Sequence, residues 1–384
     1  MTLALHDFSL ENYLQELRPL IDVDCGTYTK DGIEVIAAQM QQKYLDMGWD
    51  VNRIDCGAAG TGLEVRNKPE SSAIDVMLIG HMDTVFPEGT AAARPMTFDE
   101  KRVYGPGVSD MKSGLLNVVH ALRNIDKKIL DKLSICICMN PDEEIGSLHS
   151  EAWLKSVAVN AKNVLVAEAA RADGSLVKAR KGMARYRLTF SGKAAHAGNE
   201  PQNGRSAVTE MANWILAINN LTNFESGTTL NVGVVKGGAG ANIVPDSAEA
   251  IVDVRFWDNN EYAEADEKIR ILTETPFVEG VTITVEREAH KPSMVPTEKT
   301  EALMALVEES GKELDIEIKW QEVGGGSDAN LTAVMGIPTL DGLGPAGAGF
   351  HSADEYLELD TIEPRIKLLM KVLTKIAGSF NFVK

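Results

Sequence analysis

The sequence predicts an α/β protein with a three-layer αβα domain, into which a smaller α+β domain is inserted. Three observations carry this prediction. Short apolar runs alternate with helical patterns in the first half of the chain, strands with one polar face begin near residue 181, and the pattern of the first half returns after residue 290. A chain of 384 residues also exceeds the size at which one hydrophobic core keeps growing, so two domains are expected.

The larger domain is predicted from buried strands and the helices between them. Apolar runs typical of strands buried on both faces occupy residues 74–80, 133–139 and 163–167. A helix is expected over residues 112–123. Strands that alternate with helices form a largely parallel sheet with helices on its faces. We assign residues 1–180 and 291–384 to this discontinuous domain.

The inserted domain is predicted over residues 181–290. From 182 to 191 apolar residues alternate with polar ones, which indicates a strand with one solvent-facing side. A helix, two further strand-like runs, a second helix and a last strand follow. This β-α-β-β-α-β order is the split arrangement of a ferredoxin-like domain, with both helices on one side of the sheet.

Composition and charge exclude several classes of protein. The 38 Lys and Arg residues against 56 Asp and Glu give a net charge of −18, which disfavours nucleic acid and anionic membranes as partners. No apolar run approaches the roughly 18 residues of a membrane span, and the first residues do not resemble a secretion signal. We expect a soluble, cytoplasmic protein. The four cysteines are too few and too scattered for a disulfide framework or a thiolate zinc site.

Acidic and histidine residues follow the predicted strands of the larger domain. His81 and Asp83 come after the first strand, Glu143 and Glu144 after the second, and Glu168 after the third. Ligands of open α/β sheets bind beyond the carboxyl ends of the strands, so these side chains should converge. The residues Glu143 and Glu144 are expected in extended backbone, where neighbouring side chains point to opposite sides.

A metal site is the simplest explanation for this convergence. Carboxylates gathered in one crevice raise one another's pKa unless a cation neutralises them. Asp110, in a Gly/Pro-containing loop before a helix, is a further candidate ligand. Oxygen and imidazole ligands without thiolate suit zinc, manganese or cobalt, and a shared carboxylate would hold two ions about 3.5–4 Å apart. Singly, each residue could equally well cap a helix or lie on a solvated surface.

The motifs together resemble those of the dinuclear zinc M20 metallopeptidases, and in particular the carboxypeptidase G2-like branch. The resemblance runs from about residue 75 to 356. It rests on the segments Gly80-His-Met-Asp-Thr-Val85, Tyr104-Gly-Pro-Gly-Val-Ser-Asp-Met-Lys-Ser-Gly114, Asp142-Glu-Glu-Ile-Gly-Ser147, Ala167-Glu168, Gly326-Ser-Asp328 and Phe350-His-Ser352.

The resemblance implies a role for each matching residue of the larger domain. His81 and Glu168 would bind one Zn²⁺ and Glu144 and His351 the other, with Asp110 bridging the two. Asp83 would orient the His81 ring through its second nitrogen. Glu143 would be the general base. The peptide bond between Asp110 and Met111 is a candidate for the cis form, and Mn²⁺ or Co²⁺ could replace zinc.

For the inserted domain, the resemblance implies dimerisation and substrate contacts. Residues 181–290 would pair two subunits and act as a lid, so we expect a homodimer. His196 would reach the partner's site and polarise the substrate carbonyl. Asn242 and Arg255 match substrate-binding positions, and Arg255, opposite Val252 and Val254 on its strand, could bind a carboxylate. The backbone N–H groups of Gly324, Gly325 and Gly326, before a predicted helix, could do the same.

The function expected from the sequence is zinc-dependent hydrolysis of an amide bond. The substrate would be a small peptide or an N-acyl amino acid, and the product an amino acid, with glutamate as one candidate. An N-acyl-amino-acid deacylase of the acetylornithine or succinyl-diaminopimelate type, or a di- or tripeptidase, shares the same motifs. A non-catalytic metal-binding module is the alternative from another class. A phosphatase or nuclease agrees poorly with the acidic charge.

Overall fold

The computed structural model describes residues 5, 6 and 8–379, which form two compact units. Unit 1 comprises Met1–Ala179, Val295–Glu322 and Ser327–Lys384, and unit 2 comprises Arg180–Met294 and Val323–Gly326. The domain boundaries expected from the sequence lie at 180/181 and 290/291. The structure differs in grouping residues 180, 291–294 and 323–326 with the inserted segment.

The central sheet of unit 1 has six strands, in the order β1-β2-β6-β3-β7-β16. They are β1 (Asp50–Asp55), β2 (Thr61–Arg66), β6 (Ile135–Asn140), β3 (Val76–His81), β7 (Val164–Val166) and β16 (Thr339–Leu340). The strands β6, β3, β7 and β16 are parallel, whereas β2 runs antiparallel to both of its neighbours. The α/β class and the largely parallel sheet predicted from the sequence are confirmed.

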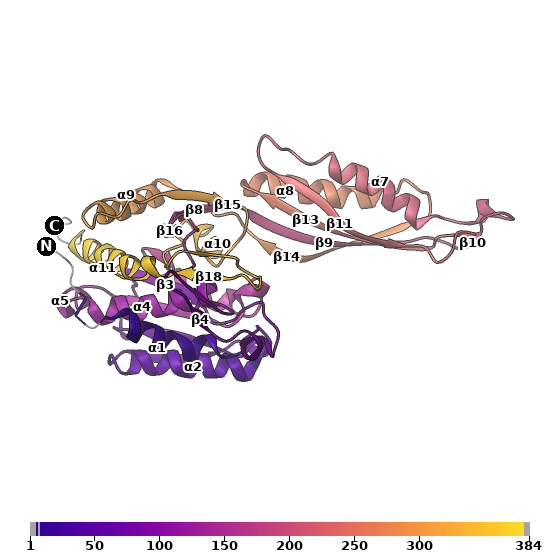
Figure 1. Ribbon diagram of the computed structural model, residues 1–384. Helices are drawn as coiled ribbons and strands as arrows, with labels where there is room; N and C mark the ends of the chain where they lie inside the picture. The colour runs from indigo at the N-terminus through magenta and orange to yellow at the C-terminus, as the bar shows by residue number, and fades with distance from the viewer. Residues whose placement is uncertain (1–4, 7, 380–384) are drawn as a thin grey trace. The chain divides into compact units, whose positions relative to one another are not determined.

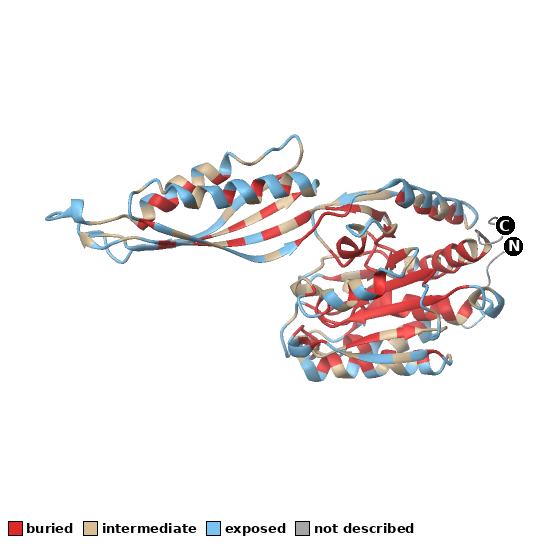
Figure 2. Ribbon diagram, turned by 180° about the vertical axis from the view of Figure 1, so that it is seen from behind, coloured by how far each residue is buried: buried red, intermediate tan, exposed pale blue. Residues whose placement is uncertain are grey.

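Helices cover both faces of this sheet (Figures 1 and 2). The strands β6, β3, β7 and β16 are buried throughout, whereas the edge strand β1 has no buried residue. The main helices of the unit are α1 (Leu10–Ile21), α2 (Lys30–Leu45), α4 (Ser113–Asn124), α6 (Glu151–Ala158), α9 (Glu298–Lys312), α10 (Ala329–Ala333) and α11 (Ile362–Ser379). Leu78 and Ile137 share one hydrophobic core with α1, α2, α4, α9 and α11. On the other face, Nε1 of Trp153 in α6 donates a hydrogen bond to Glu64 of β2, at 3.1 Å. The result is the expected three-layer arrangement.

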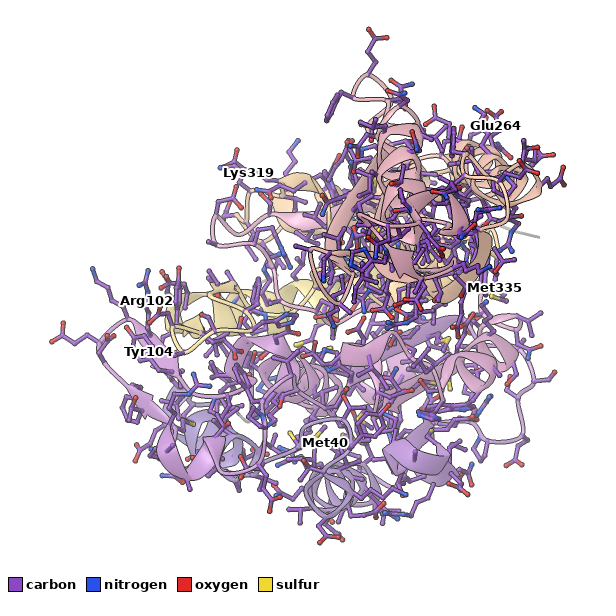
Figure 3. The ribbon with its side chains drawn as sticks, turned by 90° about the vertical axis from the view of Figure 1, so that its right-hand side faces the viewer. Met40, Arg102, Tyr104, Glu264, Lys319 and Met335 are labelled. Atoms are coloured by element: carbon purple, nitrogen blue, oxygen red, sulfur yellow. The ribbon has the colours of Figure 1, made fainter. Side chains whose placement is uncertain are left out.

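Short elements complete unit 1. They are α3 (Thr90–Ala93), α5 (Lys127–Leu130), and a second sheet in the order β17 (Gly347–Ala348), β18 (Tyr356–Glu358), β5 (Arg102–Tyr104) and β4 (Thr97–Phe98). In that sheet the guanidinium of Arg102, which is labelled in Figure 3, lies 3.8 Å from the centre of the Tyr356 ring. The pair β8 (Leu176–Arg180) and β15 (Trp320–Val323) lies where the chain passes between the units.

Unit 2 is a four-stranded antiparallel sheet with two helices. The sheet order is β11-β13-β9-β14, and its elements are β9 (Gly182–Ser191), α7 (Ala207–Asn219), β11 (Thr229–Gly237), β13 (Ser247–Phe256), α8 (Asn259–Ile271) and β14 (Thr282–Lys291). Tyr186, Phe190 and Val252 on one face of the sheet share a core with Trp214 of α7 and Ile269 of α8. Both helices therefore cover the same face, as the β-α-β-β-α-β pattern predicts. A short pair, β10 (Ala195–His196) and β12 (Ile243–Val244), joins two loops.

None of the helices in the described part of the chain combines the length and apolar character that a membrane span requires. The four cysteines are buried and carry free thiols.

Candidate metal centre

The candidate site lies at the carboxyl ends of the parallel strands β3, β6 and β7. His81 is the last residue of β3, Glu143 and Glu144 follow the end of β6, and Glu168 follows β7. Helix α4 approaches this edge closely because its second residue is Gly114. A Cβ atom there would lie 1.9 Å from the carbonyl oxygen of Ala167, next to Glu168.

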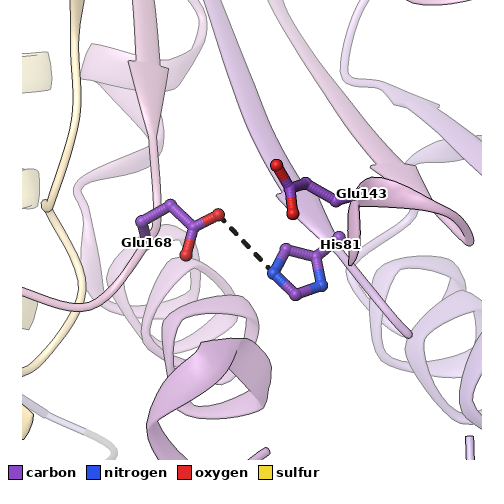
Figure 4. A group of neighbouring side chains, drawn as sticks. All are labelled: His81, Glu143 and Glu168. Carbon is purple, nitrogen blue, oxygen red and sulfur yellow. Dashed lines mark ion pairs between the residues drawn. The ribbon is translucent and has the colours of Figure 1, made fainter. Parts of the chain in front are cut away.

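One half of the site is built around His81, whose side chain is 1% exposed. Its Nε2 lies 3.1 Å from Oδ1 of Asp110 and 3.5 Å from Oε1 of Glu168. Its Nδ1 lies 3.0 Å from the backbone oxygen of Asp83. Figure 4 shows Glu143 beside His81 and Glu168, and ligand atoms of these three residues all lie within 4.8 Å of one another.

The other half is built around His351. Its Nε2 lies 3.2 Å from Oδ2 of Asp110 and 3.1 Å from Oε2 of Glu144. The two carboxylate oxygens of Asp110 thus face two different histidines, His81 and His351. The structure brings together all five predicted ligands. The peptide bond between Asp110 and Met111 is cis, as expected from the sequence.

Asp83 holds the backbone of the acidic pair. Its fully buried carboxylate accepts hydrogen bonds from the N–H groups of Glu143, at 3.1 Å, and Glu144, at 3.2 Å. Oγ1 of Thr27 donates a third, at 2.6 Å. Oδ1 of Asp83 also lies 3.3 Å from Nδ1 of His81, so an orienting role toward this ring stays a prediction.

The expectation of extended backbone at Glu143 and Glu144 is wrong. These residues begin a 3₁₀ turn, Glu143–Ile145. Consecutive N–H groups at the start of such a turn lack partners within it and point in one direction, which lets both reach Asp83. The two side chains nevertheless separate, since Glu143 lies with His81 and Glu168 while Glu144 reaches His351.

Sequence reasoning missed Glu355, which holds the loop that carries Asp110. Its side chain is buried and accepts hydrogen bonds from the N–H groups of Gly107 and Ser109, both at 2.9 Å, and of Asp110, at 3.0 Å. The sequence feature that could have pointed to Glu355 is its position, four residues after the proposed ligand His351. Thr27, which donates to Asp83, carried no signal in the sequence.

Asp328, within the matching segment Gly326-Ser-Asp328, joins a buried network beneath the site. Its carboxylate accepts hydrogen bonds from Nδ2 of Asn140, at 2.8 Å, and from the hydroxyl of Ser147. The neighbouring Asp142 accepts from the N–H of His149, at 2.6 Å, and from Oγ of Ser150, at 2.5 Å. This network fixes both ends of the loop that carries Glu143 and Glu144.

The electrostatics of the cluster favour a bound cation. Burial raises the pKa of Glu144 and of Glu168 to about 7. Burial acts in the same direction on Asp110, but hydrogen bonds from His351 and His81 outweigh it and hold its pKa well below the usual range. Burial alone would lower the pKa of His81, yet the facing carboxylates raise it well above its ordinary value. Hydrogen bonds to Asp110 and Glu144 raise the pKa of His351 to about 10.

The donor set fits two divalent cations. Within the described residues, no lysine or arginine forms an ion pair with Asp110, Glu144 or Glu168, so protonated histidines are the positive charges that face them. Imidazole nitrogen and carboxylate oxygen without thiolate suit zinc, manganese or cobalt. A carboxylate with one oxygen toward each half is the bridge expected between two ions.

The predicted residues of the inserted segment lie in unit 2. His196 is exposed, and its Nδ1 accepts hydrogen bonds from the N–H groups of Gly198 and Asn199, both at 3.1 Å. The loop of Asn242 is adjacent, since its backbone oxygen accepts from the N–H of Ala197 at 2.9 Å. The acceptor role of Nδ1 leaves Nε2 of His196 as the ring atom able to donate.

Arg255 lies on the face of β13 opposite the buried residues Val252 and Val254. Its guanidinium is held by Asp253, with Nε 2.8 Å from Oδ1 and Nη2 3.1 Å from Oδ2. Nη1 lies 3.4 Å from the carbonyl oxygen of Gly324, and the carbonyl of Gly325 accepts from Nη1 of Arg180 at 2.9 Å. Gly324 and Gly325 thus offer carbonyl groups to two arginines of their own unit.

Comparisons with known proteins agree on one family. The model of peptidase family M20/M25/M40 matches residues 77–375. Carboxypeptidase G2 of Pseudomonas sp. (strain RS-16) is 27% identical over 373 residues, which cover 95% of this chain and 89% of the relative. Acetylornithine deacetylase of Proteus mirabilis (strain HI4320) is 26% identical over 78% of each chain.

A solved structure shares the fold over the same length. Aminopeptidase PepT from Bacillus cereus ATCC 10987 superposes with a TM-score of 0.80 at 23% identity, covering 96% of this chain and 99% of its own. These relatives are named for different activities, so the likeness alone does not select a substrate.

Proposed function

The chain belongs to peptidase family M20/M25/M40, and from this premise we propose that it is a dinuclear zinc amidohydrolase. Its substrate would be a small peptide or N-acyl amino acid, from which it releases the C-terminal amino acid, with glutamate as one candidate. One observation carries the proposal: Asp110 turns one carboxylate oxygen toward His81 and the other toward His351.

The proposed ligands divide between two ions. His81 and Glu168 would hold one Zn²⁺, Glu144 and His351 the other, and Asp110 would bridge them. The contacts support this division, since Glu168 lies 3.5 Å from His81 and Glu144 lies 3.1 Å from His351. When bound, the two ions supply Lewis-acid polarisation of the amide carbonyl and acidify the attacking water.

Glu143 is the proposed general base. Its carboxylate lies beside His81 and Glu168, and its N–H is fixed by Asp83 at 3.1 Å. In this position it can accept a proton from water at one carboxylate oxygen and later deliver it to the leaving nitrogen. Asp83 keeps Glu143 in place and prevents the loop from rotating.

The inserted segment is proposed to bind substrate and to pair two subunits. His196 would polarise the substrate carbonyl across a homodimer formed through residues 181–290, and Asn242, Arg255 and the glycines 324–326 would contact substrate. The edge strand β11 supports pairing, because Val234 and Val235 on it are 45% and 51% exposed. An edge strand with exposed apolar residues favours pairing with another chain.

Other activities within the family remain in competition. The deacetylase relative favours an N-acyl-amino-acid deacylase. A di- or tripeptidase is a further alternative, because it shares the same motifs. The alternative from another class is a metal-binding module without catalysis. The presence of Glu143 beside the ligand cluster favours the enzyme.

The deciding experiment is a product-identified assay on the zinc-loaded protein. A panel of N-acyl amino acids, dipeptides and tripeptides would be tested against wild-type protein and Glu143→Gln. We expect turnover by the wild type and a loss of about 10²–10⁴-fold in the variant with zinc content unchanged. The binding module would be favoured if the protein bound two zinc ions but showed no turnover that the substitution Glu143→Gln abolishes.

A further inference from the structure

Arg255, the proposed contact for a substrate carboxylate, already binds a carboxylate of its own chain. Asp253 accepts hydrogen bonds from Nε of Arg255, at 2.8 Å, and from its Nη2, at 3.1 Å, so one arginine engages both carboxylate oxygens. A substrate carboxylate that takes the same two N–H groups has to displace Asp253. The displaced Asp253 then needs another cation, because its negative charge would otherwise lose its partner.

Arg185 of β9 is placed to receive Asp253. Strand β9 lies next to β13 in the antiparallel sheet, and Arg185 is the residue directly opposite Asp253. The residues before and after each of the two are buried, so both side chains lie on the sheet face that the helices leave open. Residues directly opposite in an antiparallel pair have Cβ atoms about 4.5–5.5 Å apart, within reach of an ion pair. On its other side Asp253 faces Asn231 of β11, which carries no charge.

The side chain of Arg185 is available for this role. It is exposed and forms no ion pair within the part of the chain that the structure describes. The next arginine on the same face of β9, Arg187, is by contrast matched by Glu249, at 2.8 Å, and by Glu288, at 2.6 Å. Two arginines thus flank Asp253, of which Arg255 holds it and Arg185 does not.

We propose that Asp253 moves from Arg255 to Arg185 when a substrate carboxylate binds to Arg255. The inference rests on the role of Arg255 in the proposed function and adds Asp253 and Arg185 as residues that determine specificity. A substrate that ends in an uncharged group cannot replace the ion pair that Arg255 forms with Asp253. The exchange therefore selects substrates with a free C-terminal carboxylate. Arg185 is a positioning residue in this scheme, since it acts through Asp253.

The test is steady-state kinetics of the zinc-loaded, full-length protein with the substrate that the panel assay identifies. Arg185→Met leaves the displaced Asp253 without a cation, so KM should rise about two- to fivefold, the range of an exposed ion pair, with kcat unchanged. Arg185→Lys keeps the charge and should restore a KM close to that of the wild type.

Asp253→Asn should change KM in the opposite direction. The structure has Asp253 on Arg255 and not on Arg185, so the first ion pair is the stronger one and its loss is only partly offset by the second. Removing the carboxylate removes this net cost, and KM should fall by up to about fivefold. In the Asp253→Asn background, Arg185→Met should have no further effect, because the two residues act as a pair.

Two further variants separate the inference from the proposed function. Lys236→Met removes another exposed cation on the same face, opposite Glu249 and about 20 Å from Arg255 along β13. Salt screens charges at that distance, so KM should not change. Arg255→Met tests the premise and should raise KM about tenfold or more.

A second readout does not depend on turnover. The Nε–H signals of the arginine side chains are followed by NMR in isotope-labelled protein during titration with the amino acid that the assay identifies as product. The signals missing from Arg185→Lys and Arg255→Lys assign the two residues. We expect both signals to shift with the same dependence on concentration, and only that of Arg255 to shift in Asp253→Asn.

The possible outcomes are distinct. If Arg255→Met leaves KM unchanged, the substrate contact in the proposed function is wrong, and the inference is wrong with it. If Arg255→Met raises KM but Arg185→Met does not, the exchange is wrong while the role of Arg255 stands. A higher KM in Asp253→Asn would show that Asp253 orients Arg255 and does not compete with the substrate. An effect of Arg185→Met that persists in the Asp253→Asn background would place Arg185 on the substrate itself and overturn the exchange.

Discussion

The carboxylate of Glu355 accepts a hydrogen bond from the backbone N–H of Asp110, at 3.0 Å, and thereby fixes the residue that faces both histidines of the candidate metal centre. The same carboxylate accepts hydrogen bonds from two more N–H groups of this loop, those of Gly107 and Ser109. The position of the proposed bridging carboxylate thus depends on a side chain that is not itself one of the proposed ligands.

The substitution Glu355→Gln tests this dependence. It replaces one acceptor oxygen by an NH₂ group among three N–H donors, so at least one donor loses its partner. We expect a loss of about 1–3 kcal/mol in the free energy of unfolding and a loss of about 10–100-fold in zinc affinity. Chemical denaturation and chelator competition measure the two effects. Glu358→Gln, three residues further along the chain, removes the charged partner of Arg102; it is the control and should leave zinc affinity unchanged.

The glycine at the start of α4 gives a second prediction. A Cβ at Gly114 would lie 1.9 Å from the carbonyl oxygen of Ala167, so Gly114→Ala must displace the strand end that carries Glu168. We expect destabilisation of about 1–3 kcal/mol or more, with weaker zinc binding. Around Gly378 in α11, no described residue outside the adjoining helix backbone lies within 4 Å of an added Cβ, and Gly378→Ala should stabilise by up to about 1 kcal/mol. Equal midpoints of thermal denaturation for Gly114→Ala and Gly378→Ala would contradict the predicted clash at Gly114.

The pH dependence of stability is predicted from Glu16, which joins α1 to its neighbours. Burial alone would raise the pKa of Glu16, but His120, Lys43 and Arg123 outweigh it and hold this pKa well below the usual range. A depressed carboxyl pKa stabilises the folded state above the unfolded value of about 4.3, and this stability is lost as the pH falls toward the folded pKa. Glu16→Gln should therefore be less stable than wild type at pH 7.

The stability difference between wild type and Glu16→Gln should shrink as the pH is lowered below about 4. Urea denaturation at pH 3, 4, 5 and 7 measures it. Glu11→Gln, on the exposed side of the same helix, is the control. A difference that stays constant across this range would show that Glu16 does not contribute through its charge.

His196→Ala tests the proposed role of the inserted segment. If Nε2 of His196 donates to the substrate carbonyl in the transition state, kcat should fall by about 10²–10³-fold. Zinc content should stay at the wild-type level because His196 belongs to unit 2, whereas all five proposed ligands belong to unit 1. Steady-state kinetics and metal analysis check both statements. Loss of zinc from this variant would show that its role is misassigned.

Much of this fold could be predicted from the sequence because its strands are distinctive. The run 182–191 alternates strictly, and the structure has β9 over the same residues. The apolar runs before His81 and Glu143 correspond to β3 and β6 within one or two residues. The ends of parallel strands meet at one edge, so the convergence of the acidic and histidine residues follows from the order of strands and polar residues along the chain.

Other features depend on contacts that the sequence pattern does not contain. The 3₁₀ turn at Glu143 forms because Asp83, 60 positions away, binds two successive N–H groups. Glu355 acts through the loop at Gly107, 248 positions before it. The pairing of Arg255 with Asp253 is local, but only the structure shows that Asp253 already holds the guanidinium.

The central claim is that His81, Asp110, Glu144, Glu168 and His351 together hold two metal ions. The most direct test is anomalous diffraction at the zinc edge from crystals of the zinc-loaded protein. We expect two anomalous peaks about 3.5–4 Å apart, one on each side of the Asp110 carboxylate. A single peak, or none within bonding distance of these five side chains, would contradict it.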